Sequence, residues 1–156
     1  GEIAGERVLL LKPDTYMNES GRAVGEACRF HKVGIGDVTA FHDELDLDPG
    51  KLKIKLGSGN AGHNGLRSIT ALVGNEFWRV RLGIGHPGSR DLVSHFVLSD
   101  FARSDKEWLE QILAAIAEEA ASLATGQDAK FVMGVLRRLA PAPTAGASTD
   151  EPEPAP

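Results

Sequence analysis

The sequence contains a single cysteine, Cys28, so no disulfide can form within the chain. It also has no basic start followed by an apolar run of the kind that directs secretion or membrane insertion. We therefore expect a cytoplasmic protein that does not contact a membrane. Cys28 shares a helical stripe with Val24, Ala27 and His31, which predicts a core side chain rather than a nucleophile.

An excess of positive charge is absent as well, since the formal net charge is -5 at pH 7. All 17 basic residues lie before residue 140, whereas three of the 22 acidic residues lie after it. The net charge of residues 1–139 is therefore -2, which excludes a basic field over the whole surface. A nucleic-acid partner would have to bind a local basic patch.

The length of 156 residues and the hydrophobic content of 42% suit one domain with a sizeable core. We place this domain at residues 1–139. From Ala140 to Pro156 the sequence is rich in Pro, Ala and Glu, which predicts a disordered tail.

A glycine-rich loop, Gly57–Gly65, lies between two clearly patterned segments. Before it, lysines alternate with apolar residues over 51–56, a period of two that predicts a half-exposed strand. After it, apolar residues recur at helical spacing up to Gly74, so His63 and Asn64 fall in the first turn of a helix. The loop should therefore lie at a helix N-terminus, where free backbone N–H groups gather.

Within this loop, Gly57, Gly59 and Gly62 satisfy the spacing of a dinucleotide-binding fingerprint. The strand that enters such a fingerprint is buried on both faces and reads as a continuous apolar run. The lysines of residues 51–55 contradict that pattern. We therefore disfavour a dinucleotide cofactor and expect none.

Basic residues also alternate along a second predicted strand, Phe77–Ile84. Together the two strands could present a stripe that contacts phosphates, although two solvated strand faces would give the same pattern. The residues of this predicted stripe are Lys51, Lys53, Lys55, Arg79 and Arg81.

Two more apolar runs predict strands, Val8–Leu11 at the centre of the sheet and Val38–Phe41. The second leads directly into acidic residues that include Asp43, at the end of a strand where open α/β sheets place ligands. A metal site would need ligands that converge from several directions, which one extended segment does not supply. We therefore expect no metal. Asn18 precedes a predicted helix, Ser20–His31, and capping alone could explain it.

Four motifs occur in a fixed order: Thr15–Gly21 (Thr-Tyr-Met-Asn-Glu-Ser-Gly), His42–Asp46 (His-Asp-Glu-Leu-Asp), the Gly57–Gly65 loop, and Arg81–Gly88 (Arg-Leu-Gly-Ile-Gly-His-Pro-Gly). Between Val8 and Leu139 the sequence resembles bacterial peptidyl-tRNA hydrolase. The resemblance implies one α/β domain with a twisted mixed sheet between helices. It also implies a monomeric, metal-free hydrolase that cleaves the ester joining a peptide to the terminal ribose of tRNA.

The resemblance assigns roles to single positions. Asp43 matches the aspartate that supports the catalytic histidine, and His63 matches a histidine that flanks the site. Asn18 and Asn64 match asparagines that contact the end of the substrate, with Tyr16 two residues before Asn18.

One part of the family pattern has no counterpart in this chain. The catalytic histidine of the family lies upstream, in a segment of the form Gly-Leu-Gly-Asn-Pro-Gly through Thr-Arg-His-Asn. The sequence opens Gly1-Glu2-Ile3 without an initiator methionine, which leads us to expect that an upstream segment is absent here. Two functions remain open: a peptidyl-tRNA esterase, and a non-catalytic RNA-binding protein with the same fold.

Overall fold

The computed structural model describes residues 1–140 and has a three-stranded sheet at its centre. The spatial order is β3 (Thr39–Glu44), β5 (Trp78–Gly83), β4 (Leu52–Leu56). β5 pairs in parallel with β3 and antiparallel with β4, so the predicted α/β fold with a mixed sheet is confirmed. The predicted tail lies outside the described residues beyond position 140.

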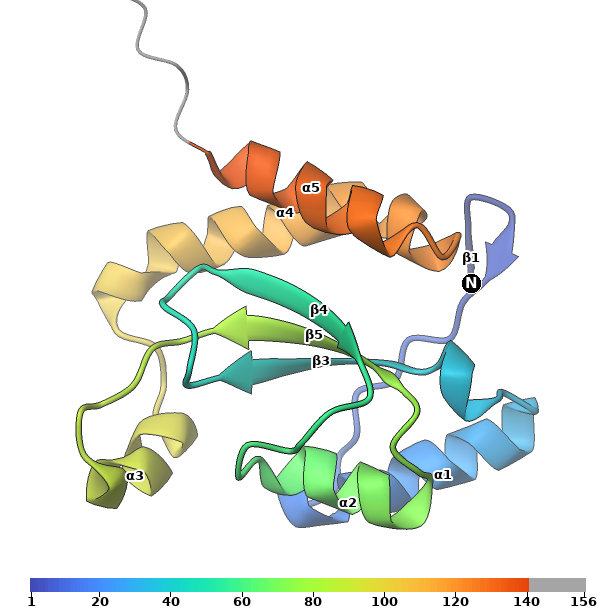
Figure 1. Cartoon of the computed structure of the whole chain (residues 1–156), viewed down its shortest axis with the longest axis horizontal. Helices are drawn as coiled ribbons and strands as arrows, with labels where there is room; N and C mark the ends of the chain where they lie inside the picture. The colour runs from blue at the N-terminus through green and yellow to red at the C-terminus, as the bar shows by residue number, and fades with distance from the viewer. Residues whose placement is uncertain (141–156) are drawn as a thin grey trace, which may run out of the picture.

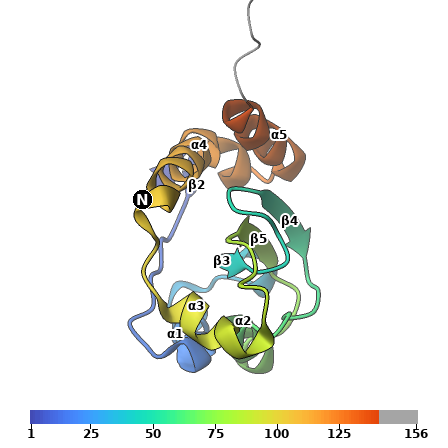
Figure 2. The same cartoon turned by 90° about the vertical axis from the view of Figure 1, so that its left-hand side faces the viewer.

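Helices cover both faces of this sheet (Figures 1 and 2). On one side lie α1 (Ser20–His31) and α2 (Asn64–Leu72), and on the other lie α4 (Lys106–Ala124) and α5 (Asp128–Leu139). The short α3 (Val93–Leu98) follows β5. Single turns of 3-10 helix complete the chain: η1 (Met17–Glu19), η2 (Ile35–Asp37), η3 (Arg90–Leu92) and η4 (Arg103–Asp105). Within residues 1–140, no helix has both the length and the apolar character needed to cross a membrane.

The two faces of the sheet contribute to two separate hydrophobic clusters. The α4/α5 side contains Leu52, Val80, Ile112, Ala115, Phe131 and Val135. The α1/α2 side contains Val24, Leu66, Ile69 and Phe77, with Cys28 packed against them. Cys28 therefore belongs to the core, as its helical stripe predicted. Two of the motifs, Thr15–Gly21 and Gly57–Gly65, lie at the α1/α2 side.

The prediction of a central strand at Val8–Leu11 is wrong. The chain instead forms a hairpin of β1 (Glu2–Ile3) and β2 (Glu6–Arg7), and the apolar run that follows pairs with no strand of the described sheet. Ala4 and Gly5 both have positive φ, 52° and 83°, as a tight two-residue hairpin turn requires. Leu10 is 86% exposed, so apolar composition alone did not determine burial here.

Helices α1 and α2 approach each other closely at Gly21. The backbone N–H of Gly21 donates to Ser68 Oγ at 2.9 Å, and a Cβ at this position would lie 2.1 Å from the Ser68 carbonyl oxygen. Asn18 lies in η1, one turn before this contact, and makes no side-chain cap for either helix. Capping therefore does not explain Asn18, whereas the close approach brings η1 to the start of α2.

We predict that Gly21→Ala destabilises the fold by about 1–3 kcal/mol, because the new methyl group would overlap main-chain atoms of α2. Chemical unfolding of the variant measures this loss. Gly36→Ala is the matched control, since a Cβ at Gly36 would meet no atom within 4 Å. Equal stabilities of the two variants would show that the α1–α2 contact is looser than described.

Candidate functional site

His63 connects the glycine-rich loop to the end of β3. It is the N-cap of α2, and its Nδ1 accepts hydrogen bonds from the backbone N–H groups of Gly65 (3.1 Å) and Leu66 (3.3 Å). Its Nε2 lies 3.1 Å from Asp43 Oδ1. Because Nδ1 accepts, the ring proton must be on Nε2, which donates to the Asp43 carboxylate. Both ring nitrogens of His63 are therefore engaged.

Asp43 stays ionised in this arrangement. The hydrogen bond from His63 lowers the pKa of the Asp43 carboxyl below its usual value, and this effect outweighs that of burial, which raises it. The side chain of Asp43 is 39% exposed. An anionic oxygen therefore remains accessible to a further hydrogen-bond donor.

His42 contacts the main chain of Asp43 rather than its carboxylate. Its side chain is buried, and its Nδ1 lies 2.7 Å from the carbonyl oxygen of Asp43, to which it must donate. The ring contacts the ring of His63 edge to face, with centroids 5.2 Å apart. Burial is the main cause that lowers the pKa of His42, so the imidazole is neutral at pH 7. The sequence alone assigned no role to His42, because its place opposite Arg81 follows from the register of β3 with β5.

A cavity of about 690 Å³ opens between η1 and α2. It is lined by Tyr16, Met17, Asn18, Asn64, Arg67, Ser68, Ala71, Leu72 and Leu98. Among the lining residues, Asn64 directly follows His63 in the chain. The structure thus brings together Asp43 with His63, and Tyr16 with both asparagines.

The two asparagines of the cavity are available to a ligand. Asn18 and Asn64 are exposed, and within residues 1–140 their side-chain amides form no hydrogen bond with the protein. Each amide can both donate and accept, so two of them at one wall can orient carbonyl and hydroxyl groups. Gly65 allows η1 to pack closely against the start of α2, since a Cβ at this position would lie 2.7 Å from the sulfur of Met17.

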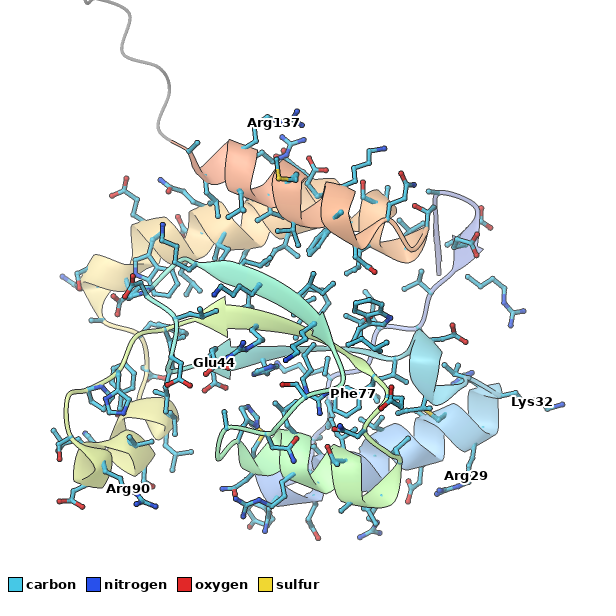
Figure 3. The ribbon with its side chains drawn as sticks, in the orientation of Figure 1. Arg29, Lys32, Glu44, Phe77, Arg90 and Arg137 are labelled. Carbon is cyan, nitrogen blue, oxygen red and sulfur yellow. The ribbon has the colours of Figure 1, made fainter. Side chains whose placement is uncertain are left out.

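The predicted basic stripe is only partly present. Lys51, Lys53 and Lys55 are exposed at the edge strand β4, and Lys53 lies opposite Arg81 in the register. Arg81 is 26% exposed, and its Nε donates to Glu44 Oε2 at 2.8 Å. Figure 3 shows Glu44 at the C-terminal end of β3.

The assignment of Arg79 to this stripe is wrong. Its side chain is 1% exposed and stacks over the ring of Phe77, which lies between the sheet and α2 (Figure 3). Arg79 and Arg81 do share one face of β5, as their alternation predicts. However, α2 and the loop before it cover the Arg79 end of that face, so this guanidinium cannot reach a phosphate in solvent.

No three His, Cys, Asp or Glu side chains gather as a metal ion would require in the described part of the chain. The site therefore consists of one oriented carboxylate, one engaged imidazole and two free amides. Such groups can position an ester and polarise a base, as hydrolysis of an ester requires.

The chain is similar to known proteins in both sequence and fold. The peptidyl-tRNA hydrolase of Methylobacterium nodulans is 64% identical over 129 residues, which cover 83% of this chain and 64% of that protein. That of Cereibacter sphaeroides is 58% identical over 141 residues, which cover 90% of this chain and 63% of that protein. The chain thus spans less than two thirds of the length of these relatives.

The crystal structure of peptidyl-tRNA hydrolase from Acinetobacter baumannii superposes with a TM-score of 0.81 at 37% identity, over 86% of this chain and 69% of that one. The sequence profile of the family described as peptidyl-tRNA hydrolase matches residues 1–140, which are all the residues that the structure describes. The chain belongs to the peptidyl-tRNA hydrolase family.

Proposed function

We propose that this chain contributes the carboxylate and the substrate-binding amides of a site that hydrolyses the ester between a peptide and the terminal ribose of tRNA. One observation carries the proposal: His63 holds Asp43 by a hydrogen bond, and the residue after it, Asn64, presents a free amide together with that of Asn18 at the wall of the cavity. A protein that only bound RNA would have no need for an oriented carboxylate at this position.

The reaction needs a positioned water and a general base. The water oxygen attacks the ester carbonyl carbon while the base takes its proton, and the bond from that carbon to the ribose oxygen then breaks. The proton passes to the ribose oxygen, so the products are a peptide with a free carboxyl group and a tRNA with a free terminal hydroxyl. Asn18 and Asn64 would hold the substrate end, and Tyr16 would offer an aromatic surface two residues from Asn18.

We assign the general base to a histidine of the upstream segment that the family resemblance implies. Asp43 would orient this imidazole and stabilise the imidazolium, as carboxylates do in other hydrolases. His63 suits the role of base poorly, because a proton on Nδ1 would face the N–H groups of Gly65 and Leu66. His63 would instead act on the site by holding Asp43.

The tRNA backbone would contact Lys51, Lys53 and Lys55, with Arg81 beside them. Lys51 directly precedes β4, Lys53 and Lys55 lie on it, and Arg81 lies on β5 between Lys53 and His42, one residue from Asp43. A local patch of this size suits a protein whose overall charge is negative. We also infer that the protein works as a monomer in the cytoplasm, where peptidyl-tRNA arises during translation.

We predict that the 156-residue chain hydrolyses peptidyl-tRNA slowly, and that a version carrying the upstream histidine segment is faster by a factor on the order of 10² to 10⁴. In the longer version, Asp43→Asn should lose roughly 10²-fold or more, because the base is no longer oriented. Release of peptide from a labelled peptidyl-tRNA measures both rates. Full turnover by the 156-residue chain would place the base within residues 1–156 and overturn the assignment.

Binding of tRNA by the basic patch should weaken steeply with salt, because phosphate contacts release counterions. We predict that Lys53→Ala and Lys55→Ala each lower the slope of log affinity against log salt by about one. Arg29→Ala is the control, since Arg29 is exposed on the outer side of α1, away from the sheet (Figure 3). Equal slopes for all three variants would show that the lysines are only solvated.

A further inference from the structure

Arg79 is the one arginine of the sheet that lies fully inside the protein. The side chain is 1% exposed, and its guanidinium lies 4.0 Å from the ring centroid of Phe77. Within residues 1–140, no carboxylate forms an ion pair with it. Its Nε is buried without a hydrogen-bond partner. The hydrogen bonds of the guanidinium therefore go to neutral acceptors. Burial lowers the pKa of Arg79, and the nearby charge of Glu76 offsets this only in part. Burying a cation without a direct ion pair is costly.

The two terminal nitrogens of Arg79 contact three separate segments. Nη1 donates to the backbone carbonyls of Asn75 and Phe77, each at 3.3 Å, just before β5. Nη2 lies 2.8 Å from Asn75 Oδ1, 3.4 Å from Thr70 Oγ1 of α2, and 3.3 Å from Asn60 Oδ1 of the glycine-rich loop. The planar fork of a guanidinium can serve acceptors in several directions at once, which a lysine cannot.

Asn60 connects this buried cation to His63. Its side-chain oxygen accepts from Arg79 and also from Thr70 Oγ1, at 3.1 Å. Its backbone carbonyl accepts the N–H of His63 at 2.7 Å. His63 in turn caps α2 and donates to Asp43. A continuous series of hydrogen bonds therefore leads from the interior of the sheet to the carboxylate of the site.

The loop between β4 and α2 needs such support. Ser58 and Ala61 both have positive φ, 114° and 45°, although neither is glycine. Residues other than glycine rarely adopt a positive φ, and such a backbone conformation persists only where the surrounding structure fixes it. In this loop, Asn60 lies between the two strained residues and is the one whose side chain bonds to Arg79.

We propose that Arg79 is a positioning residue, which fixes the glycine-rich loop through Asn60 and thereby holds His63 in hydrogen-bonding reach of Asp43. The consequence for catalysis rests on the proposed function. The structural part, that Arg79 controls the His63–Asp43 hydrogen bond, does not depend on any activity. It can be tested in the 156-residue chain without substrate.

The test compares Arg79→Met, Arg79→Lys and Asn60→Ala by NMR. Methionine fills similar space without donors, and lysine keeps the charge but lacks the fork. Val135→Ala is the control, because Val135 is buried in the other cluster, between the sheet and α5. It should destabilise the whole fold without touching the loop.

Three signals report on the site rather than on global stability. In Arg79→Met, exchange of the Gly65 and Leu66 amides should accelerate about tenfold or more relative to amides of α5, since they lose the ordered Nδ1 acceptor. The His63 ring should populate both tautomers, and the pKa of Asp43 should rise toward its usual value. Asn60→Ala should give the same changes, and the double variant should add little to either.

Two results would overturn the proposal. One is a folded Arg79→Met variant with wild-type signals from His63 and Asp43, and the other is changes of equal size in Val135→Ala. If Arg79→Met does not fold, Arg79→Lys decides: altered His63 signals support the proposal, and unchanged signals overturn it. In the longer, histidine-bearing version, loss of hydrolysis in Arg79→Met without these NMR changes would also overturn the positioning role, whereas the NMR changes with hydrolysis unaffected would support that role and count against the proposed function.

Discussion

The structure of the site depends on one imidazole that forms hydrogen bonds in two directions. Nδ1 of His63 satisfies backbone N–H groups at the start of α2, and Nε2 donates to Asp43 at the end of β3. Helix starts leave such N–H groups without intrahelical partners, so the first interaction fixes the ring and its tautomer. Because the tautomer is fixed, the second interaction always presents a proton to the carboxylate. The glycine-rich loop, α2 and β3 are thereby joined at one point.

The hydrogen bonds of His63 leave the residues of the site in two different states, fixed and free. A carboxylate with a lowered pKa remains charged and can stabilise a cationic partner. Both ring nitrogens of His63 are already in hydrogen bonds with the protein, so neither is free to contact a water molecule. Asn18 and Asn64 are unconstrained by comparison, since they are exposed at the wall of the cavity. Asp43 and His63 are thus held by the fold, and the two amides that we propose contact the substrate remain free of protein partners.

Much of this arrangement could be predicted from the sequence, because it depends on local patterns. The alternation of Lys51–Leu56 and the glycine-rich loop placed His63 and Asn64 at a helix start, where they are found. Arg79 could not be assigned in the same way. Alternation along a strand tells which residues share a face, but the segments that cover that face come from elsewhere in the chain. Val8–Leu11 illustrates the same point, since burial of an apolar run depends on a neighbouring strand that the run itself does not specify.

The most direct test is a crystal structure of this chain with a stable analogue of the peptide-bearing terminal adenosine of tRNA, in which an amide replaces the ester. We predict that the analogue occupies the cavity between η1 and α2, with the amides of Asn18 and Asn64 at about 3 Å from its polar groups. His63 should keep its hydrogen bond to Asp43. An analogue bound elsewhere, or a His63 ring turned away from Asp43 to contact the carbonyl of the analogue, would contradict the proposed roles of these residues.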